Sequence, residues 1–503
     1  MDTRGRILLI FATILVLIFV GSASARTWNV NDDGGGDFSV IQEAIINASM
    51  GDTIIVHSGV YYENVYVNMS VTLKGIGYPV VDANGSGSVI TLNADGITLV
   101  GFNATNSGGM WECAGINVIS SNNTITGNNV RNNGWNGIRV VSSCNNSITS
   151  NNLCNNEYSI SLSDSNNNTI TDNNVSNNKY GGIYLADSSN NNSITGNTFV
   201  NNGLRVDDSY QNIVAGNIVN GKPLVYLEDA SDYTVKDAGQ VILVNCTNIT
   251  VENGELSNTD VGIALWKTEN SRISNNNVSN NNCGSISISD SSNNNTITGN
   301  KVCNNNGDGI SIYDSCNNSI TGNNASSNSN VGIYLSGDSS NNAITSNKVC
   351  NNSNVGIWLM ILPFNNTIID NNVSNNNGGI FLSRSCNNSI TGNHVGANND
   401  DGISISRSGN NCITGNTFVH DGLSVDDSYQ NIVDGNIVNG KPLVYLEDAS
   451  NYTVEDAGQV ILVNCTNITV ENLDLANTSV GVELWKTEDS KVLNNRLVAK
   501  LLF

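Results

Sequence analysis

The chain has 503 residues and carries 44 Asp and Glu against 21 Lys and Arg, which gives a formal net charge of -23. Nucleic-acid binding needs a basic face that neutralises phosphates, and this charge balance excludes it. The 11 cysteines and 3 histidines include no Cys-x-x-Cys and no Cys and His at metal-ligand spacing.

Residues 1–25 are predicted to form a secretory signal peptide. Arg4 and Arg6 precede an apolar run from Ile7 to Val20, and Ala23-Ser24-Ala25 suits signal-peptidase cleavage. The run is shorter than the roughly 20 residues that cross a bilayer as a helix. We therefore expect a secreted or cell-surface protein with no membrane span after cleavage.

Residues 26–110 are expected to form an N-terminal cap and the first coils of a repeat. In "DFSVIQEAIINA", Phe38, Ile41 and Ile45 fall on one face of a short helix, with Asp37 as its N-cap. Such a helix would cover the open strand edges of the first coil.

From residue 111 to 503 the chain repeats one phrase. "NNSITGN" begins at Asn191, Asn317 and Asn387, and the isoleucines of such phrases recur 22 to 24 residues apart. A fixed period in this range is typical of a solenoid. Each unit holds three short alternating apolar runs separated by turn residues, which predicts three strands per coil of a parallel β-helix.

Asparagine is expected to be mainly structural. It tolerates the left-handed backbone that sharp turns need, and at a fixed position in successive coils its side chains can bond to one another. The same phrase creates glycosylation sequons such as Asn145-Asn146-Ser147 as a by-product, and we expect only a minority to carry glycan.

The cysteines fall at equivalent repeat positions, as Cys144, Cys316 and Cys386 show. We interpret them as small apolar residues of the stack. A disulfide framework stays open as the alternative.

Two segments, 196–282 and 415–499, are near copies. The 48 residues from Val206 return from Val425 with three changes, Ala215 to Asp434, Asp232 to Asn451 and Lys236 to Glu455. Within the copies, 221–239 and 440–458 exceed a normal turn and are predicted to form protruding hairpins. The hairpins offer six candidate ligand-binding residues, with a packed structural flap as the alternative: Tyr226, Glu228, Tyr233, Tyr445, Glu447 and Tyr452.

A second candidate surface comes from the middle residue of G-I-x-L, which points outward because strand side chains alternate. In three successive coils this residue is Tyr334, Trp358 and Phe381. They would form a flat strip suited to sugar rings, or would only stabilise the stack by ring packing.

The residues that match a known family are "GDFSVIQEAIINASMGDTIIVHSGVYYENV" and "NGKPLVYLEDASDYTVKDAGQVILVNCTNITVEN". The chain resembles right-handed parallel β-helix repeat proteins of the NosD type, a periplasmic copper-binding family also found among archaeal exported and surface proteins. The resemblance implies an all-β, right-handed parallel β-helix and, by the family name, copper.

The residues offer copper little support. Copper prefers imidazole and thioether ligands, and we interpret His57, His394 and His420 as ordinary solvated histidines. Aspartates after the third strand form a ladder that could hold Ca²⁺ weakly, although turn capping explains them equally well: Asp164, Asp187, Asp290, Asp314 and Asp338. No metal ligand and no cofactor is assigned.

These observations favour an exported cell-surface scaffold that binds carbohydrate or another envelope component. One alternative is a polysaccharide lyase or hydrolase; another is a NosD-like accessory protein for metallo-enzyme maturation. The carboxylate pairs Asp207-Asp208, Asp400-Asp401 and Asp426-Asp427 suit acid/base chemistry poorly, because neighbours on a strand face opposite sides. We assign no catalytic residue, and the enzymatic alternative stays open.

Overall fold

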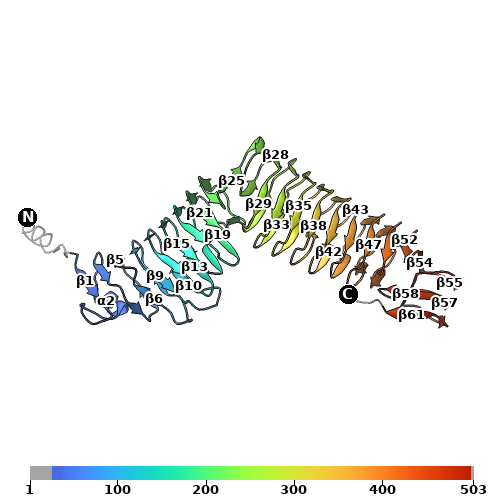
Figure 1. The fold of residues 1–503 in the computed structure, drawn as a ribbon, viewed down its shortest axis with the longest axis horizontal. Coiled ribbons are helices and arrows are strands. Elements are labelled where there is room, and N and C mark those ends of the chain that lie inside the picture. The colour runs from blue at the N-terminus through green and yellow to red at the C-terminus, as the bar shows by residue number, and fades with distance from the viewer. Residues whose placement is uncertain (1–24, 500–503) are drawn as a thin grey trace, which may run out of the picture. The chain divides into compact units, whose positions relative to one another are not determined.

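The computed structural model describes residues 25–499, so the predicted signal peptide lies outside the described residues. The chain divides into two compact units, 1–151 and 152–503. Each unit is a stack of parallel β-coils in which strands pair in parallel with their equivalents in the neighbouring coil (Figure 1). The predicted all-β parallel β-helix is confirmed.

From residue 25 onward, the N-terminal unit holds one helix, α2 (Ile41–Asn47), and three columns of strands. The first column is β1 (Thr27–Val30), β2 (Thr53–Val56), β5 (Thr72–Gly75), β8 (Thr98–Val100), β11 (Thr124–Thr126) and β14 (Ser147–Thr149). The second is β3 (Val60–Tyr61), β6 (Val80–Asp82), β9 (Asn103–Thr105) and β12 (Asn129–Arg131). The third is β4 (Val65–Val67), β7 (Ile90–Leu92), β10 (Ala114–Val118) and β13 (Asn136–Val141).

The capping helix forms, but not with the predicted cap. Its N-cap residue is Val40, which makes no side-chain cap. Instead, the Glu63 carboxylate accepts the backbone N–H groups of Ile41 at 2.8 Å and Gln42 at 2.9 Å. The Asp37 carboxylate accepts the N–H of Asn29 instead. Phe38, the next residue, forms a β-bridge with Val30, so the chain at Asp37 lies beside β1 and not at the start of the helix.

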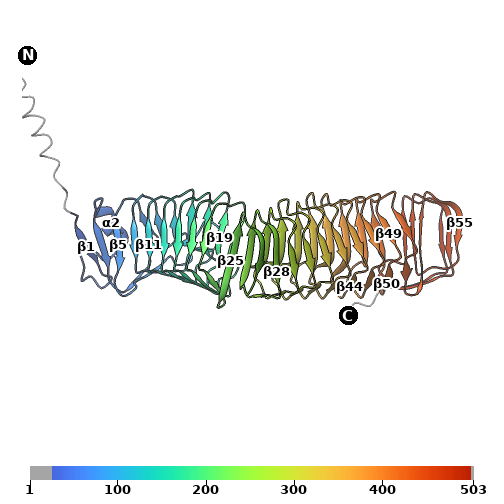
Figure 2. The ribbon, with the colours of Figure 1, turned by 90° about the horizontal axis from the view of Figure 1, so that it is seen from above.

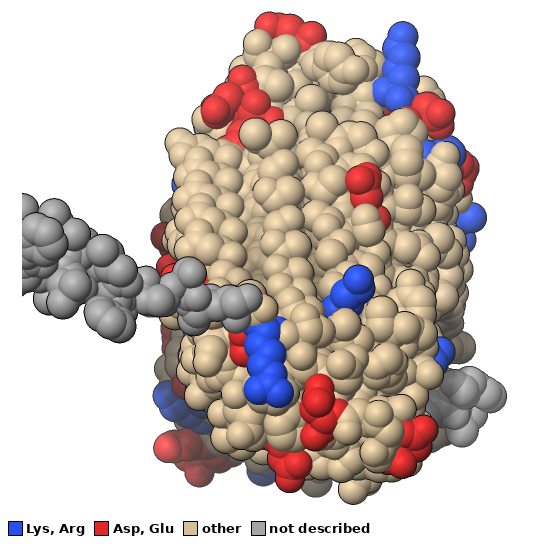
Figure 3. Space-filling view, turned by 90° about the vertical axis from the view of Figure 1, so that its left-hand side faces the viewer, with Lys and Arg blue, Asp and Glu red and all other residues tan. Residues whose placement is uncertain are grey.

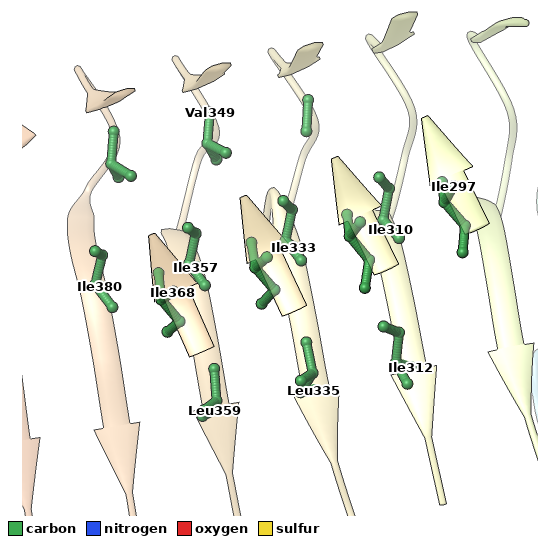
Figure 4. Close-up of a cluster of buried hydrophobic side chains, with 14 of the residues drawn as sticks. Ile297, Ile310, Ile312, Ile333, Leu335, Val349, Ile357, Leu359, Ile368 and Ile380 are labelled. Carbon is green, nitrogen blue, oxygen red and sulfur yellow. The ribbon is translucent and has the colours of Figure 1, made fainter. Parts of the chain in front are cut away.

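The C-terminal unit repeats the same coil, and its strands run side by side in both ribbon views (Figures 1 and 2). A typical coil is β34 (Thr296–Thr298), β35 (Lys301–Cys303) and β36 (Asp308–Tyr313). The isoleucines of the repeated phrase stack directly, as Ile297 on Ile320 and Ile344 on Ile368. All four are fully buried, and Figure 4 shows their neighbours in rows along the interior.

The two asparagines of each "NN" have separate roles. The first is exposed and has a positive φ, as at Asn317 and Asn341. The second is buried and joins a ladder, in which the backbone N–H of Asn318 donates to Oδ1 of Asn342 at 2.8 Å. The asparagine five positions later forms a second ladder, in which Asn323 donates from its backbone N–H and its Nδ2 to Oδ1 of Asn347 at 2.9 and 3.0 Å. The predicted amide ladder is therefore present.

All 11 cysteines lie within the described residues, and all are free thiols. Cys303 and Cys350 are buried at equivalent positions of the stack, two coils apart. This agrees with small apolar residues and not with a disulfide framework.

The G-I-x-L strands of the C-terminal unit form two successive sheets. The first contains β16 (Tyr158–Ser163), β19 (Gly181–Ala186) and β22 (Leu204–Val206). The second, which we call the outer sheet, contains β25 (Lys222–Glu228), β27 (Gln240–Val244), β30 (Val261–Trp266), β33 (Gly284–Ser289), β36, β39 (Ile333–Ser336), β42 (Val355–Met360), β45 (Gly378–Ser383), β48 (Ile403–Ser406) and β51 (Leu423–Asp426).

The predicted hairpin at 221–239 is wrong. The chain reverses at Asn220 and Gly221, both with positive φ, so that β24 (Ile218–Val219) pairs antiparallel with β25. Strand β25 then pairs in parallel with β27, and β26 (Ser231–Val235) with β28 (Thr247–Glu252). The surplus residues thus form a coil of the stack, because stacking buries the apolar face of β25 where a protruding hairpin would expose it.

The second copy repeats this arrangement, so the hairpin predicted at 440–458 is also wrong. Asn439 and Gly440 reverse the chain between β53 (Ile437–Val438) and β54 (Lys441–Glu447). Strand β54 pairs in parallel with β56 (Gln459–Val463), and β55 (Ser450–Val454) pairs with β57 (Thr466–Glu471).

Candidate functional site

The middle residues of G-I-x-L form one column on the outside of the outer sheet. Tyr334 lies beside Trp358, and Trp358 beside Phe381, and all three are half-buried while their strand neighbours point inward. The full run, which we call the outer column, is Ala264, Ser287, Ser311, Tyr334, Trp358, Phe381, Ser404 and Ser424.

The aromatic part of the outer column is not flat, as the sequence had suggested. The Tyr334 and Trp358 rings lie edge to face, with centroids 5.9 Å apart and an interplanar angle of 66°. Tyr313 adds a fourth ring, 5.5 Å from Tyr334 at 70°. Sequence reasoning missed Tyr313 because it ends its strand in "GISIY", two positions after the middle residue.

Next to Tyr313 the face opens into a cavity of about 340 Å³, which we call the junction cleft. It lies where β22, the last strand of the first sheet, meets the start of the outer sheet. Its polar and aromatic lining is Arg205, Asp207, Asp208, Trp266, Cys283, Ser287, Ser289, Asp290, Asp308, Ser311 and Tyr313. Sequence reasoning missed the cleft, although the repeat break between residues 206 and 261 is its visible signal.

Arg205 is the one basic residue among the described residues that line the cleft. Its guanidinium pairs with Asp207 at 2.7 Å and lies 5.1 Å from the centre of the Tyr184 ring, while the Tyr184 hydroxyl donates to Asp207 at 3.0 Å. Burial lowers the pKa of Arg205, but the Asp207 carboxylate outweighs it and leaves that pKa raised. Burial and Asp207 also raise the pKa of Tyr184. The Arg205 guanidinium, the Asp207 carboxylate and the neutral Tyr184 phenol are therefore held together by direct contacts.

Asp207 and Asp208 were predicted to lie on a strand with their carboxylates on opposite sides, and the structure differs. Strand β22 ends at Val206, and Asp208 has a φ of 46°. Both carboxylates therefore belong to a turn, and both line the cleft.

An aromatic wall closes one side of the cleft. Trp266 stacks on Tyr210 with centroids 3.8 Å apart, and its indole N–H donates to Asp290. Lys267 donates to the Tyr210 hydroxyl at 2.9 Å. The wall thus combines an indole face with a carboxylate acceptor.

Behind the lining lies a buried acid. Asp260 is fully buried and accepts the N–H of Gly182 at 2.7 Å. Burial raises its pKa to about 6. Burial and Asp260 raise the pKa of Cys283 to about 11, so this thiol stays protonated and is a poor nucleophile.

Of the candidates proposed on the hairpins, Tyr226 and Glu228 lie on β25 of the outer sheet, where Tyr226 is beside Ile242 and Ile242 is beside Ala264 of the outer column. Tyr226 donates to Glu228 at 2.7 Å, and Glu228 accepts the N–H of Gln211 at 2.6 Å. The second copy repeats both bonds, with Tyr445 donating to Glu447 and Gln430 donating from its N–H. In both copies these bonds connect the end of the strand to a residue of the preceding coil.

The two remaining hairpin candidates are the most exposed. Tyr233 on β26 and Tyr452 on β55 are 52% and 54% exposed. Neither strand belongs to the outer sheet.

Copper, which the NosD resemblance implies, needs a group of ligating side chains. Among residues 25–499 no three His, Cys, Asp or Glu side chains gather as a metal site would require. His394 begins β47 (His394–Gly396) beside Asn372 and Thr417, and His57 contacts Asn29. The donors do not fit copper.

The aspartates proposed for Ca²⁺ lie mostly in tight turns. Asp164, Asp187, Asp290 and Asp314 have positive φ values between 46° and 52°, and Asp314 accepts the N–H of Asp338 at 2.9 Å. These contacts are those of turn capping.

Two general features complete the surface. Within the part of the chain that is described, no helix is long and apolar enough to cross a membrane. On the face shown in Figure 3, the Lys and Arg side chains and the Asp and Glu side chains are both spread among uncharged residues, and neither forms a broad patch.

Comparison with known proteins gives a family and more distant likenesses. The family model for the periplasmic copper-binding protein NosD matches residues 45–239, 232–357 and 338–440. A cell surface glycoprotein of Methanothermus fervidus is 38% identical over 100 residues, which are 18% of this chain and only 16% of the relative's length.

Among solved structures, the A-module of the Azotobacter vinelandii mannuronan C-5 epimerase AlgE4 is 13% identical with a TM-score of 0.34, over 78% of this chain and 93% of that one. The bacteriophage CBA120 tailspike protein 3 is 14% identical with a TM-score of 0.28, over 82% of this chain and 60% of that one.

Proposed function

The chain belongs to the family of the periplasmic copper-binding protein NosD, and within it we propose an exported surface β-helix that binds carbohydrate along its outer sheet. The family description and the relative named as a cell surface glycoprotein support export. The signal peptide predicted at residues 1–25 supports it independently.

The observation that carries the proposal is the continuity of the outer face. The outer column leads from the junction cleft at Ala264 through Ser287 and Ser311 to the rings of Tyr334, Trp358 and Phe381. Neighbouring strands are about 4.8 Å apart, so the column from Ala264 to Phe381 extends roughly 24 Å. A linear polymer can lie along it, with apolar ring faces on the aromatics and hydroxyls on serines and carboxylates.

The test is binding of polysaccharides to the purified protein and to Trp358→Ala. Removing the indole should weaken binding at least tenfold, because Trp358 is the middle ring of the aromatic run. Tyr452→Ala is the matched control, since Tyr452 is exposed but lies away from the outer sheet. Binding that ignores Trp358→Ala, or no binding across a broad polysaccharide panel, would exclude this surface.

One observation favours a second candidate, a polysaccharide lyase or hydrolase. Asp207, Asp208, Asp290 and Asp308 line one cleft with Arg205, and paired carboxylates are what glycoside hydrolysis uses. Release of reducing ends or unsaturated products from the bound polymer, abolished by Asp290→Asn, would support it. A polymer that binds and stays intact would count against it.

A further inference from the structure

The duplication gives the molecule two junctions whose edge strands end in the same way. At the first, the Gln240 side chain accepts the Leu204 N–H at 2.9 Å and donates to the Leu204 carbonyl at 2.7 Å. At the second, Gln459 does the same for Leu423, at 2.9 and 2.6 Å. A primary amide thus takes the place of a missing strand on this edge.

The next backbone groups on this edge differ between the junctions. At the second junction Glu483 accepts the Val425 N–H, at 3.1 and 3.3 Å to its two oxygens. Val206 is the equivalent of Val425 in the first copy, and Ala264 is the equivalent of Glu483. Alanine has no acceptor, so the first junction lacks this bond.

The ladder geometry fixes the direction of the Val206 groups. On the other edge of β22, Asp207 donates to Leu185 and Ile183 donates to Gly203, which uses alternate residues of the strand. The N–H and C=O of Val206 therefore point to the same side as those of Leu204, and Val206 lines the junction cleft. Within the described chain, no protein acceptor takes the Val206 N–H.

The charge of the cleft lining indicates which group of a ligand could accept the Val206 N–H. Four aspartates and one arginine line the cleft, and Arg205 is already paired with Asp207. A ligand carboxylate would meet an excess of negative charge. An uncharged amide would not, and Gln240 shows that an amide fits this edge, accepting from N–H and donating to C=O.

The cleft volume of about 340 Å³ is near the lower end of the roughly 300–1,000 Å³ of small-molecule sites. It has room for about one or two sugar rings, beside the Trp266 and Tyr313 rings that also line it.

We propose that the junction cleft is a subsite for an N-acetylated amino sugar, whose acetamido group bonds to the N–H and C=O of Val206 as Gln240 bonds to Leu204. This rests on the proposed function, since it names the sugar class that the outer face holds. The acidic lining disfavours uronate residues.

The experiment measures binding of four β-1,4-linked tetrasaccharides by calorimetry: N-acetylglucosamine, glucosamine, glucose and mannuronate. The N-acetylated tetramer should bind at least tenfold more tightly than the glucose tetramer, with mannuronate weakest. Ala264→Glu and Ala264→Gln each place a side-chain acceptor against Val206 and should both weaken that binding at least tenfold. Tyr452→Ala, which lies away from the outer sheet, is the control and should stay within about twofold of wild type.

Thermal unfolding of each variant shows whether it is folded, which the natural Glu483 leads us to expect for Ala264→Glu. Equal affinity for the glucose and N-acetylglucosamine tetramers would overturn the inference, as would Ala264→Gln that binds like wild type. Tight binding of mannuronate would also overturn it while leaving the proposed function standing. If none of the tetramers and no polysaccharide binds, the proposed function itself fails.

Discussion

Asn323 donates two hydrogen bonds to Oδ1 of Asn347, from its backbone N–H and from Nδ2, and both residues are buried. Asn347 repeats this with Asn371 one coil further on. Each amide is thus the acceptor for one coil and the donor for the next.

Asn347→Ala should therefore destabilise the stack by about 1–3 kcal/mol, because it leaves the buried backbone N–H of Asn323 without an acceptor, whereas Nδ2 of Asn323 keeps the Ile297 carbonyl. Urea denaturation of the full chain measures this. Asn341→Gly is the matched control: Asn341 is exposed at φ 56°, a conformation that glycine adopts easily. A loss that is equal in both variants would contradict a special role for the ladder.

Gln240→Leu should loosen β22, because the N–H and C=O of Leu204 lose the amide that satisfies them. Hydrogen exchange at the Leu204 amide should accelerate at least tenfold. Gln459→Leu serves as the internal control, since it should accelerate Leu423 and leave Leu204 unchanged. Unchanged exchange at Leu204 in Gln240→Leu would show that the edge does not depend on this side chain.

Glu483 should make stability depend on pH. Burial raises its pKa to about 7, opposed by the hydrogen bond from Val425 and assisted by Asp401 and Asp426. The folded protein then holds this proton more strongly than the unfolded chain, whose Glu pKa is about 4.3. Stability from this group is present below about pH 4.3 and is lost as the pH rises through about 7.

The measurement is the thermal midpoint of wild type and Glu483→Gln between about pH 4 and 9. Wild type should lose stability relative to Glu483→Gln across this range, and the difference should level off above about pH 8. A constant difference across the range would show that Glu483 has an ordinary pKa.

Copper should not bind as a stoichiometric ligand. The described residues gather no three metal-ligating side chains, although the family is described as copper-binding. Metal analysis after dialysis against Cu²⁺ should find well under one ion per chain. The His394→Ala/His420→Ala double variant should be indistinguishable from wild type, and one tightly held ion that this variant loses would contradict the expectation.

The repeat made the fold readable from the sequence. The spacing of Ile297, Ile320 and Ile344 predicts the register that the structure shows. The G-I-x-L pattern predicts that the Trp358 side chain points outward from its strand. Both depend on local alternation within a strand, which a single sequence records.

What the sequence could not reveal depends on contacts between distant segments. Glu63 caps the helix at Ile41 from a later coil, and no local pattern marks it. The extra residues after Gly221 were mistaken for a hairpin because their partners in β27 lie beyond the next turn. The junction cleft arises from the same break in register, so its lining could not be assembled in advance.

The asparagine ladder also has a direction. In the ladder of Asn323, Asn347 and Asn371, each Oδ1 accepts from the preceding coil and each Nδ2 donates to the Oδ1 of the following one, and the ladder through Asn376 and Asn398 ends on the carboxylate of Asp421. A block of coils can therefore be copied and joined head to tail without a clash of like groups, whereas an inverted block would set oxygen against oxygen. The polarity of one side chain thus explains how a chain of this kind lengthens by duplication.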